Sequence, residues 1–278
     1  MAKLKTFSGF PVQNLSSDST SVGQIYYNTT SGQFKAVKNG GAPIGTWASG
    51  GSLNTKRMAA GGAGTQTAGT IFGGDADGGS PRYGLHEQYN GTSWTEATDL
   101  NQGASYVGGV GTQTSALKFG GYSSQRWDLT ELWNGSSWTE LNEQNTARFG
   151  QASVGQVSTA ALTVGGSSAS SATSDVVEQW NGTSWTEVNE INNGRSYFGG
   201  SGTTASGLVF GGTPESGYTE SWNGSTWTEQ NNLGTTRRNI TGVGTSSAAL
   251  AVGGEPPIMT NTEEWTAAAF EVKTLTTS

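Results

Sequence analysis

Cysteine is absent from the 278-residue chain, and histidine occurs once, at His86. A chain without cysteine has no disulfide framework, no thiolate zinc site and no iron–sulfur cluster, and a single histidine excludes a site built from several. No apolar run approaches the roughly 20 residues that a membrane-spanning helix needs. Residues 1–20 also lack the apolar core of a secretory signal. We therefore expect no metal, no cofactor, no membrane insertion and no classical export.

Charge is scarce as well, and its balance is acidic. The chain has 14 Lys and Arg against 21 Asp and Glu, a net charge of −7, which argues against a nucleic-acid partner held by phosphate contacts. Charged residues make up 13% and hydrophobic residues 32%, below the usual shares of roughly 25% and 45–50%. Glycine, with 44 copies, fills much of the gap, while ten tryptophans argue against disorder. Small, turn-forming residues with a few very large side chains favour many short strands.

The chain contains an internal repeat. A Gly-Gly pair ends an apolar run five times, after Phe72, Phe119, Val164, Phe210 and Val252. Successive members of this series are 42 to 47 residues apart. An aromatic residue, Asn-Gly, and then Trp-Thr-Glu follow the first four pairs, starting at Tyr89, Trp133, Trp180 and Trp222. The fifth copy keeps only Trp265 and Phe270, at the same offset. Repeats of about this length are typical of propeller blades.

Each repeat predicts four short strands. In the third repeat these are residues 149–155, 159–164, 176–180 and 183–188, and the Asn181-Gly182 pair predicts a tight hairpin between the last two. Four antiparallel strands in about 45 residues correspond to one blade of a β-propeller. The predicted fold is therefore an all-β propeller.

The third repeat also resembles a known family. Arg148, a strand ending in Gly165-Gly166, Trp180, Trp185 and the closing Arg195 resemble the kelch repeat, and the resemblance extends over about residues 54–270. It implies a kelch-like β-propeller of four-stranded antiparallel blades. It implies no activity, because the copper chemistry of the kelch-type oxidase requires a cysteine.

The number of blades depends on the N-terminal region. Residues 23–37 read as a hairpin, and Trp47 precedes Arg57 by ten residues, as Trp138 precedes Arg148. We predict an N-terminal arm over residues 1–20 and a propeller over 21–278, with a partial blade over 21–53 and five repeats over 54–278. This gives six blades, and a five-bladed ring with an N-terminal appendage is the alternative.

The same hairpin carries a second resemblance. Residues 23–37 with Trp47 are similar to a short module of bacteriophage tail and other virion proteins, and the tandem WNGTSWTE and FGG motifs look like propellers of marine phage structural proteins. The resemblance implies a non-enzymatic virion structural protein of a tail or fibre, in contact with other virion proteins, that recognises a host-surface carbohydrate or protein receptor. A capsid or tail decoration or adaptor protein is the alternative. A homo-oligomer is compatible with either function, although no motif demands one.

Residues that recur in every repeat are expected to serve the scaffold. The repeated tryptophans should fill the space between adjacent blades, because burying one removes about 150–250 Å² from water. The recurring arginines, Arg57, Arg148, Arg195 and Arg237, should pair with a carbonyl or carboxylate between blades. No pair of carboxylates or other catalytic constellation is evident, so we expect no enzyme.

The candidate ligand-binding residues lie in loops that differ between repeats. These loops, residues 75–85, 122–128, 167–175, 213–218 and 255–262, should share one rim of the propeller, and a loop free of the repeat can carry specificity. Simple drift of exposed loops is the alternative. Aromatic and arginine side chains suit recognition, and the candidates are Arg82, Tyr83, Tyr122, Arg126, Trp127 and Tyr218.

Overall fold

The computed structural model describes residues 13–15, 25–30, 33–36, 50–76, 81–214, 216–258 and 260–267. The chain divides into two compact units, Met1–Ser49 and Gly50–Ser278. In the first unit, β1 (Gln13–Leu15), β2 (Ile25–Asn28) and β3 (Gln33–Ala36) form one sheet in the order β1-β2-β3. The antiparallel pairing of β2 with β3 is the hairpin that the sequence predicts at this place.

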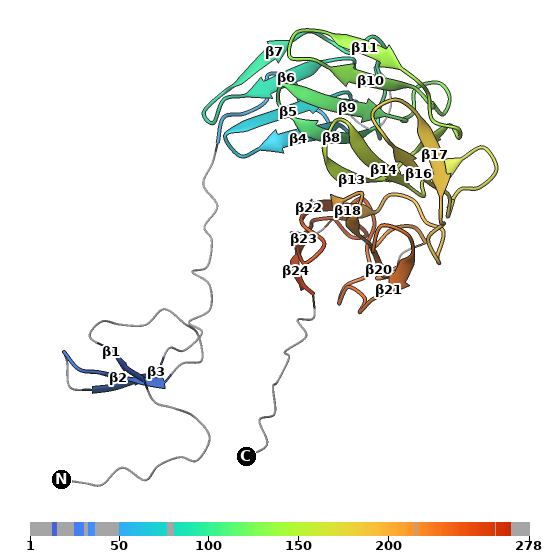
Figure 1. The fold of residues 1–278 in the computed structure, drawn as a ribbon. Helices are drawn as coiled ribbons and strands as arrows, with labels where there is room; N and C mark the ends of the chain where they lie inside the picture. The colour runs from blue at the N-terminus through green and yellow to red at the C-terminus, as the bar shows by residue number, and fades with distance from the viewer. Residues whose placement is uncertain are drawn as a thin grey trace, which may run out of the picture. The chain divides into compact units, whose positions relative to one another are not determined.

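The second unit is a β-propeller of five blades (Figure 1). Blade 1 consists of β4 (Gly61–Thr65), β5 (Ala68–Phe72), β6 (His86–Tyr89) and β7 (Trp94–Ala97). Blade 2 consists of β8 (Gly108–Thr112), β9 (Ser115–Phe119), β10 (Thr130–Trp133) and β11 (Trp138–Leu141). Blade 3 consists of β13 (Ala152–Val157), β14 (Ala160–Val164), β16 (Val177–Trp180) and β17 (Trp185–Val188).

Blade 4 follows the same plan, and blade 5 has three strands within the described residues. Blade 4 consists of β18 (Gly199–Thr203), β19 (Ser206–Phe210), β20 (Thr219–Trp222) and β21 (Trp227–Glu229), and blade 5 of β22 (Thr241–Gly244), β23 (Ala248–Val252) and β24 (Thr262–Thr266). A short ladder of β12 (Arg148–Phe149) and β15 (Ser167–Ser168) lies beside blade 3. The strands β4, β8, β13, β18 and β22 lie innermost and line a central channel (Figure 1). The predicted all-β propeller of four-stranded antiparallel blades is confirmed.

The main prediction of six blades is not supported, whereas the five-blade alternative fits. The reason is strand pairing. Among the described residues, β1, β2 and β3 bond only to one another, so they do not extend a blade of the repeat. The spacing of Trp47 from Arg57 matches a fourth strand, but a matching strand does not by itself make a further blade. Trp47 and Phe270, to which the sequence assigns fourth strands, lie outside the described residues.

The hairpin between the third and fourth strands is longer than the sequence predicts. In blade 3, Trp180 pairs with Trp185, so the loop has four residues and not two. Only Gly182 has a positive φ, +95°, while the Asn181 Oδ1 atom accepts hydrogen bonds from the N–H groups of Thr183 and Ser184 at 2.9 Å each. The side chain of asparagine therefore builds this turn, which explains why it recurs.

Tryptophans hold neighbouring blades together, as predicted. Trp185 of blade 3 contacts the ring of Phe119 in blade 2 at 5.1 Å, and its Nε1–H donates to Thr130 Oγ1 at 2.9 Å. Trp138 of blade 2 contacts Phe72 of blade 1 in the same way, at 5.0 Å. Each indole is buried and its one donor is satisfied, so the interface combines apolar area with a fixed orientation.

Candidate ligand-binding rim

The recurring arginines form buried ion pairs inside single blades. In blade 3, Arg148 Nη2 donates to Glu178 Oε1 at 2.5 Å, and Nη1 donates to the carbonyls of Gly165 and Val176. The corresponding pairs are Arg57 with Glu87, Arg195 with Glu220 and Arg237 with Glu263. The predicted carboxylate and carbonyl partners are confirmed, but the placement between blades is wrong. An arginine at the start of a blade reaches the third strand of its own sheet because that strand lies within one side-chain length.

Blade 2 also places a cation beside its buried glutamate, but it uses different residues. Ala104 occupies the position of the recurring arginine, and the charge comes from Lys118 on β9, whose Nζ lies 3.6 Å from Glu131 Oε1. Both side chains are 0% exposed. Burial lowers the pKa of Lys118, and the nearby charge of Glu131 opposes that shift. A buried glutamate in this fold therefore always has a cation beside it, in each blade that the structure describes.

A ring of left-handed residues surrounds one mouth of the central channel. The residue two positions after the recurring arginine, or after Ala104 in blade 2, has a φ between +53° and +64° in all five blades: Ala59, Tyr106, Gly150, Tyr197 and Asn239. Backbone hydrogen bonds connect these residues from blade to blade, for example from Tyr106 N to Ala59 O at 2.6 Å and from Asn239 N to Tyr197 O at 2.7 Å. The ring is thus a product of the scaffold, while its side chains vary.

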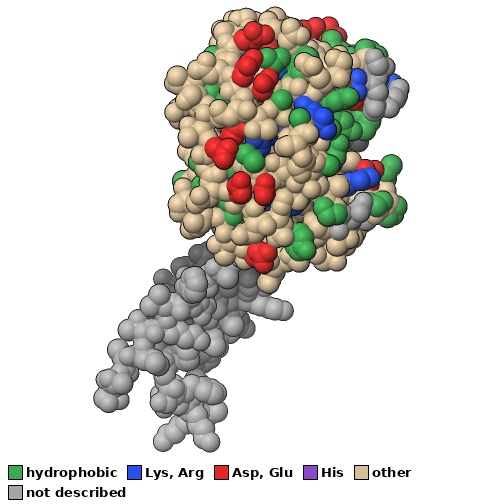
Figure 2. All heavy atoms as spheres, turned by 90° about the vertical axis from the view of Figure 1, so that its right-hand side faces the viewer, with side chains coloured by type: hydrophobic (Ala, Val, Ile, Leu, Met, Phe, Trp, Pro, Cys, Tyr) green, Lys and Arg blue, Asp and Glu red, His purple; other side chains and the backbone are tan. Residues whose placement is uncertain are grey.

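These residues line a hollow of about 480 Å³ at the mouth. Glu255 also lines it, as do two strongly exposed hydrophobic side chains, Met58 (47% exposed) and Ile258 (91% exposed). Figure 2 shows Lys, Arg and hydrophobic side chains gathered along one edge of its view, while most acidic side chains lie over the middle. A hollow that is partly apolar and bordered by aromatic rings is suited to binding a ligand.

An aromatic cluster extends from the mouth across blades 2, 3 and 4. Phe149 lies at its centre. The centre of its ring is 6.0 Å from that of Tyr106, 5.0 Å from that of Tyr122 and 5.9 Å from that of Tyr197. The rings of Tyr106 and Tyr197 also contact each other at 5.3 Å. We call Tyr106, Tyr122, Phe149 and Tyr197 the rim cluster.

Two arginines predicted from the sequence stack on this cluster. The guanidinium carbon of Arg82 lies 4.7 Å from the centre of the Tyr122 ring, and that of Arg126 lies 5.5 Å from the centre of Phe149. The structure therefore brings together Arg82, Tyr122 and Arg126, three of the six predicted residues.

The other three predicted residues lie apart from the rim cluster. Trp127 packs against the hydrophobic core that contains Phe72 and Trp138, and its ring faces Lys118 Nζ at 5.4 Å. Tyr83 is half-buried, and its backbone N–H donates to Gly74 O at 2.7 Å. Tyr218 is 43% exposed in the loop before β20 of blade 4.

Sequence reasoning missed Tyr106, Phe149 and Tyr197. They lie just before the inner strands, within two residues of the recurring arginine or, in blade 2, of Ala104, and not in the loops that vary in length. For Tyr106 and Tyr197, the available signal was the change of residue type at one fixed position of the repeat.

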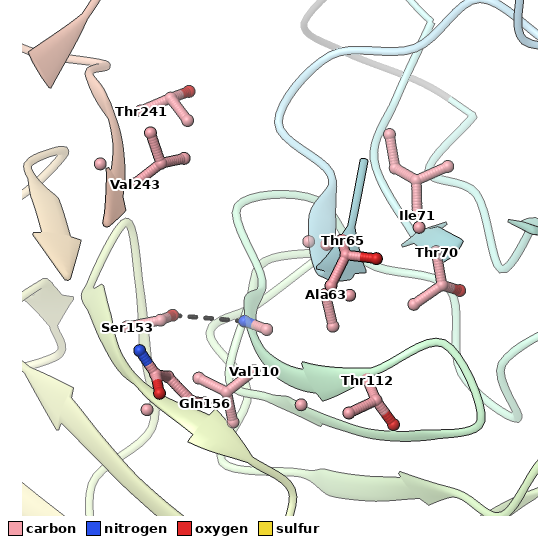
Figure 3. Close-up of a pocket in the computed structure, with 18 of the residues that line it drawn as sticks. Ala63, Thr65, Thr70, Ile71, Val110, Thr112, Ser153, Gln156, Thr241 and Val243 are labelled. Carbon is pink, nitrogen blue, oxygen red and sulfur yellow. Dashed lines mark hydrogen bonds between the residues drawn. The ribbon is translucent and has the colours of Figure 1, made fainter. Parts of the chain in front are cut away.

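The opposite part of the channel has a different character. It is a hollow of about 830 Å³ that is lined mostly by the inner strands, together with part of β5 and Trp94 of β7, and no charged residue lines it. Figure 3 shows the small and polar side chains there, including Ser153, whose Oγ accepts a hydrogen bond from Gly109 N at 3.2 Å. Its surface is therefore neutral and poor in large side chains.

Within the described part of the chain, no group of three or more His, Asp or Glu side chains could hold a metal ion. No helix within these residues is long and apolar enough to cross a membrane.

Comparison with known proteins extends to the fold alone. No protein-family model matches the chain, and no curated protein matches it. A solved structure of YjhT is similar with a TM-score of 0.61 and 13% sequence identity, and the match covers 83% of each chain. At this identity the likeness shows a shared β-propeller fold.

Proposed function

We propose that this chain is a non-enzymatic recognition protein whose rim cluster binds a saccharide of a host-cell surface. One observation carries the proposal: tyrosine occupies two of the five left-handed positions at the channel mouth, Tyr106 and Tyr197.

The backbone alone does not call for tyrosine there. A left-handed conformation costs a residue with a Cβ about 1–2 kcal/mol, and glycine or asparagine adopts it more readily. Blades 3 and 5 use Gly150 and Asn239 at the same position. Tyrosine therefore adds conformational strain at a position where glycine or asparagine would adopt the same backbone with less strain. Strained residues cluster at binding sites.

The chemistry of the cluster suits a saccharide. Aromatic rings present flat apolar faces for the C–H groups of a sugar ring, and the tyrosine hydroxyls add hydrogen-bonding groups beside them. Burial raises the pKa of Tyr106 and of Tyr197, so both hydroxyls stay protonated at neutral pH. Tyrosine and arginine are also the residues that most often dominate binding energy at interfaces.

The setting that we propose is a bacteriophage virion, on the tail or a fibre, with other virion proteins as partners. The similarity of residues 23–37 to the phage module supports this setting, as does the similarity of the repeats to kelch-like phage propellers. A small N-terminal unit followed by a propeller also suits a protein that attaches through one unit and binds through the other.

A second function, an adaptor or decoration protein, is favoured by a different observation. Met58 and Ile258 expose large apolar side chains at the same mouth. Exposed apolar side chains around a hollow are typical of protein–protein contacts. In this alternative the mouth binds another virion protein and no saccharide.

The test replaces both tyrosines with the residue that blade 5 uses. The double variant Tyr106→Asn/Tyr197→Asn should stay folded, because asparagine tolerates a left-handed backbone. Binding to host cells and to an array of neutral and acidic glycans should fall at least about tenfold, the effect of losing roughly 1.4 kcal/mol. Val157→Asn, an exposed position at the far end of β13, is the control and should bind as the unmodified chain does.

Two results would contradict the proposal. Undiminished glycan binding by the double variant would remove the tyrosines from the site. Binding to purified virion proteins without any glycan binding would favour the adaptor function, and electron microscopy of particles would then locate the chain.

A further inference from the structure

The described arginines fall into two groups. Five form ion pairs: Arg57, Arg148 and Arg195 with buried glutamates, Arg237 with the partly exposed Glu263, and Arg238 with Glu255 at 3.2 Å. Within the described residues, Arg82 and Arg126 form no ion pair, although the chain as a whole has a net charge of −7. Two positive charges on the same rim therefore have no counter-charge among the residues that the structure describes.

Their surroundings hold these two arginines in place without neutralising them. Arg82 and Arg126 stack on Tyr122 and Phe149, and these two rings contact each other at 5.0 Å. The one hydrogen bond of the Arg126 side chain goes to Ser167 Oγ, at 3.3 Å, and the Nε atoms of both arginines are buried without an acceptor. Stacking on a ring fixes the plane of a guanidinium group, and such a group binds carboxylate or sulfate oxygens through several N–H donors.

Among the described residues, no acidic side chain near the mouth lies within ion-pair distance of Arg82 or Arg126. Asp75 is buried, 1% exposed, and its backbone pairs with the backbones of Met58 and Arg82. Glu255 accepts hydrogen bonds from Arg238 Nε at 3.2 Å and from Asn239 Nδ2 at 2.7 Å. The far part of the channel, in contrast, has no charged lining. An anionic ligand would therefore be bound beside the mouth, at Arg82 and Arg126, and not inside the hollow, whose one charged lining residue is Glu255.

We infer that the ligand of the rim is an anionic saccharide, whose carboxylate or sulfate group is bound by Arg82 and Arg126 while the rim cluster contacts the sugar rings. The inference rests on the proposed function and adds the class of saccharide. Carboxylate and sulfate present the same oxygen acceptors to the two guanidinium groups, so the test uses one probe of each kind.

The experiment compares three probes by calorimetry: an oligogalacturonate, the same oligomer as its full methyl ester, and a sulfated galactan oligomer. We expect the oligogalacturonate, the sulfated galactan or both to bind at least about tenfold more tightly than the ester, the effect of one charged hydrogen-bonding partner. Because this preference is electrostatic, it should shrink when the salt concentration rises from about 0.05 M to about 0.5 M.

Variants identify the groups responsible. Arg82→Met/Arg126→Met keeps side chains of similar length without the charge, and it should bind acid and ester equally. Arg82→Lys/Arg126→Lys keeps the charge but loses the planar donors, and it should retain part of the preference. Thermal unfolding of each variant confirms that the propeller is folded before binding is compared.

The outcomes separate the inference from the proposed function. If acid and ester bind alike while Tyr106→Asn/Tyr197→Asn still abolishes binding, the anionic class is wrong and saccharide recognition stands. If the acid preference survives in Arg82→Met/Arg126→Met, these arginines are not its source and the inference is wrong. If the folded chain binds none of the three probes and shows no tyrosine-dependent binding on the glycan array, both are wrong.

Discussion

Arg148 and Arg126 are the same residue type in neighbouring parts of the propeller, and their surroundings are opposite. Arg148 is completely buried, donates to a glutamate and three carbonyls, and has equivalents in three other blades. Arg126 is only partly buried, stacks on a ring and has no acidic partner in the described residues. The contrast shows that each scaffold arginine has a carboxylate beside it. In Arg148 the set of partners is complete, whereas Arg195 and Arg237 also keep buried N–H groups without an acceptor. A rim arginine that has no carboxylate beside it among the described residues is therefore informative about a ligand.

Removing Arg148 from its complete set of partners should lower the stability of the fold more than any other change considered below. Arg148→Met leaves the carboxylate of Glu178 buried without a cation, which should lower the free energy of unfolding by about 3–5 kcal/mol. Arg126→Met removes a stacking contact worth about 0.5–1 kcal/mol and leaves no buried charge behind. Urea denaturation of both variants measures the contrast.

A third variant serves as the control for Arg148. Arg148→Met/Glu178→Leu removes both charges, and it should recover most of the lost stability, because an apolar pair can replace a buried ion pair at little cost. Equal losses for Arg148→Met and Arg126→Met would show that the two arginines do not differ as the structure indicates.

The next largest effect concerns the buried ion pair of blade 2, compared with that of blade 3. Lys118→Thr should destabilise blade 2 by about 3 kcal/mol, because Glu131 then has no cation beside it. Ala104→Arg/Lys118→Thr reproduces the arrangement of blade 3, where Arg148, Thr163 and Glu178 occupy these positions. We expect this double variant to regain stability in urea denaturation relative to Lys118→Thr. A double variant no more stable than the single one would mean that the two blades are not interchangeable here.

The repeat explains why much of the scaffold could be predicted. Burial of Trp138 and Trp185, and the pairing of Arg148 with a carboxylate, follow from residues that every blade needs for the same packing. The number of blades does not follow from the repeat in this way. It depends on which strands pair with which, and the N-terminal hairpin has strand-like sequence whether or not it joins a blade.

The candidate site was only partly predictable, for a related reason. Arg82, Tyr122 and Arg126 lie in variable loops, where a repeat comparison directs attention. Tyr106 and Tyr197 lie at a fixed position of the repeat, and their left-handed backbone is invisible without coordinates. The substitution of Lys118 for the missing arginine of blade 2 is equally hidden, because Lys118 comes from the adjacent strand and not from the equivalent position.

The smallest effect concerns His86, which occupies the position on β6 that Thr130 occupies on β10. His86 is buried, its Nδ1 lies 3.1 Å from Thr98 O, and its Nε2 lies 2.6 Å from Thr70 Oγ1. Burial lowers the pKa of His86 below its ordinary value of 6.5, although the carbonyl of Thr98 and the charge of Asp99 oppose the shift. Above pH 6.5 the folded state therefore favours the neutral imidazole.

The sign of the pH dependence follows from this shift. Between the lowered pKa of the folded state and the ordinary value of 6.5, the unfolded chain binds more protons at His86 than the folded chain does. Stability from this group is therefore complete above pH 6.5 and is lost as the pH falls through that interval. We expect the melting temperature to fall more steeply between about pH 7 and about pH 5.5 in the unmodified chain than in His86→Thr, whose threonine can accept from Trp138 as Thr130 accepts from Trp185. Because His86 is the only histidine of the chain, parallel melting curves for the two proteins across this range would mean that its burial does not couple to folding.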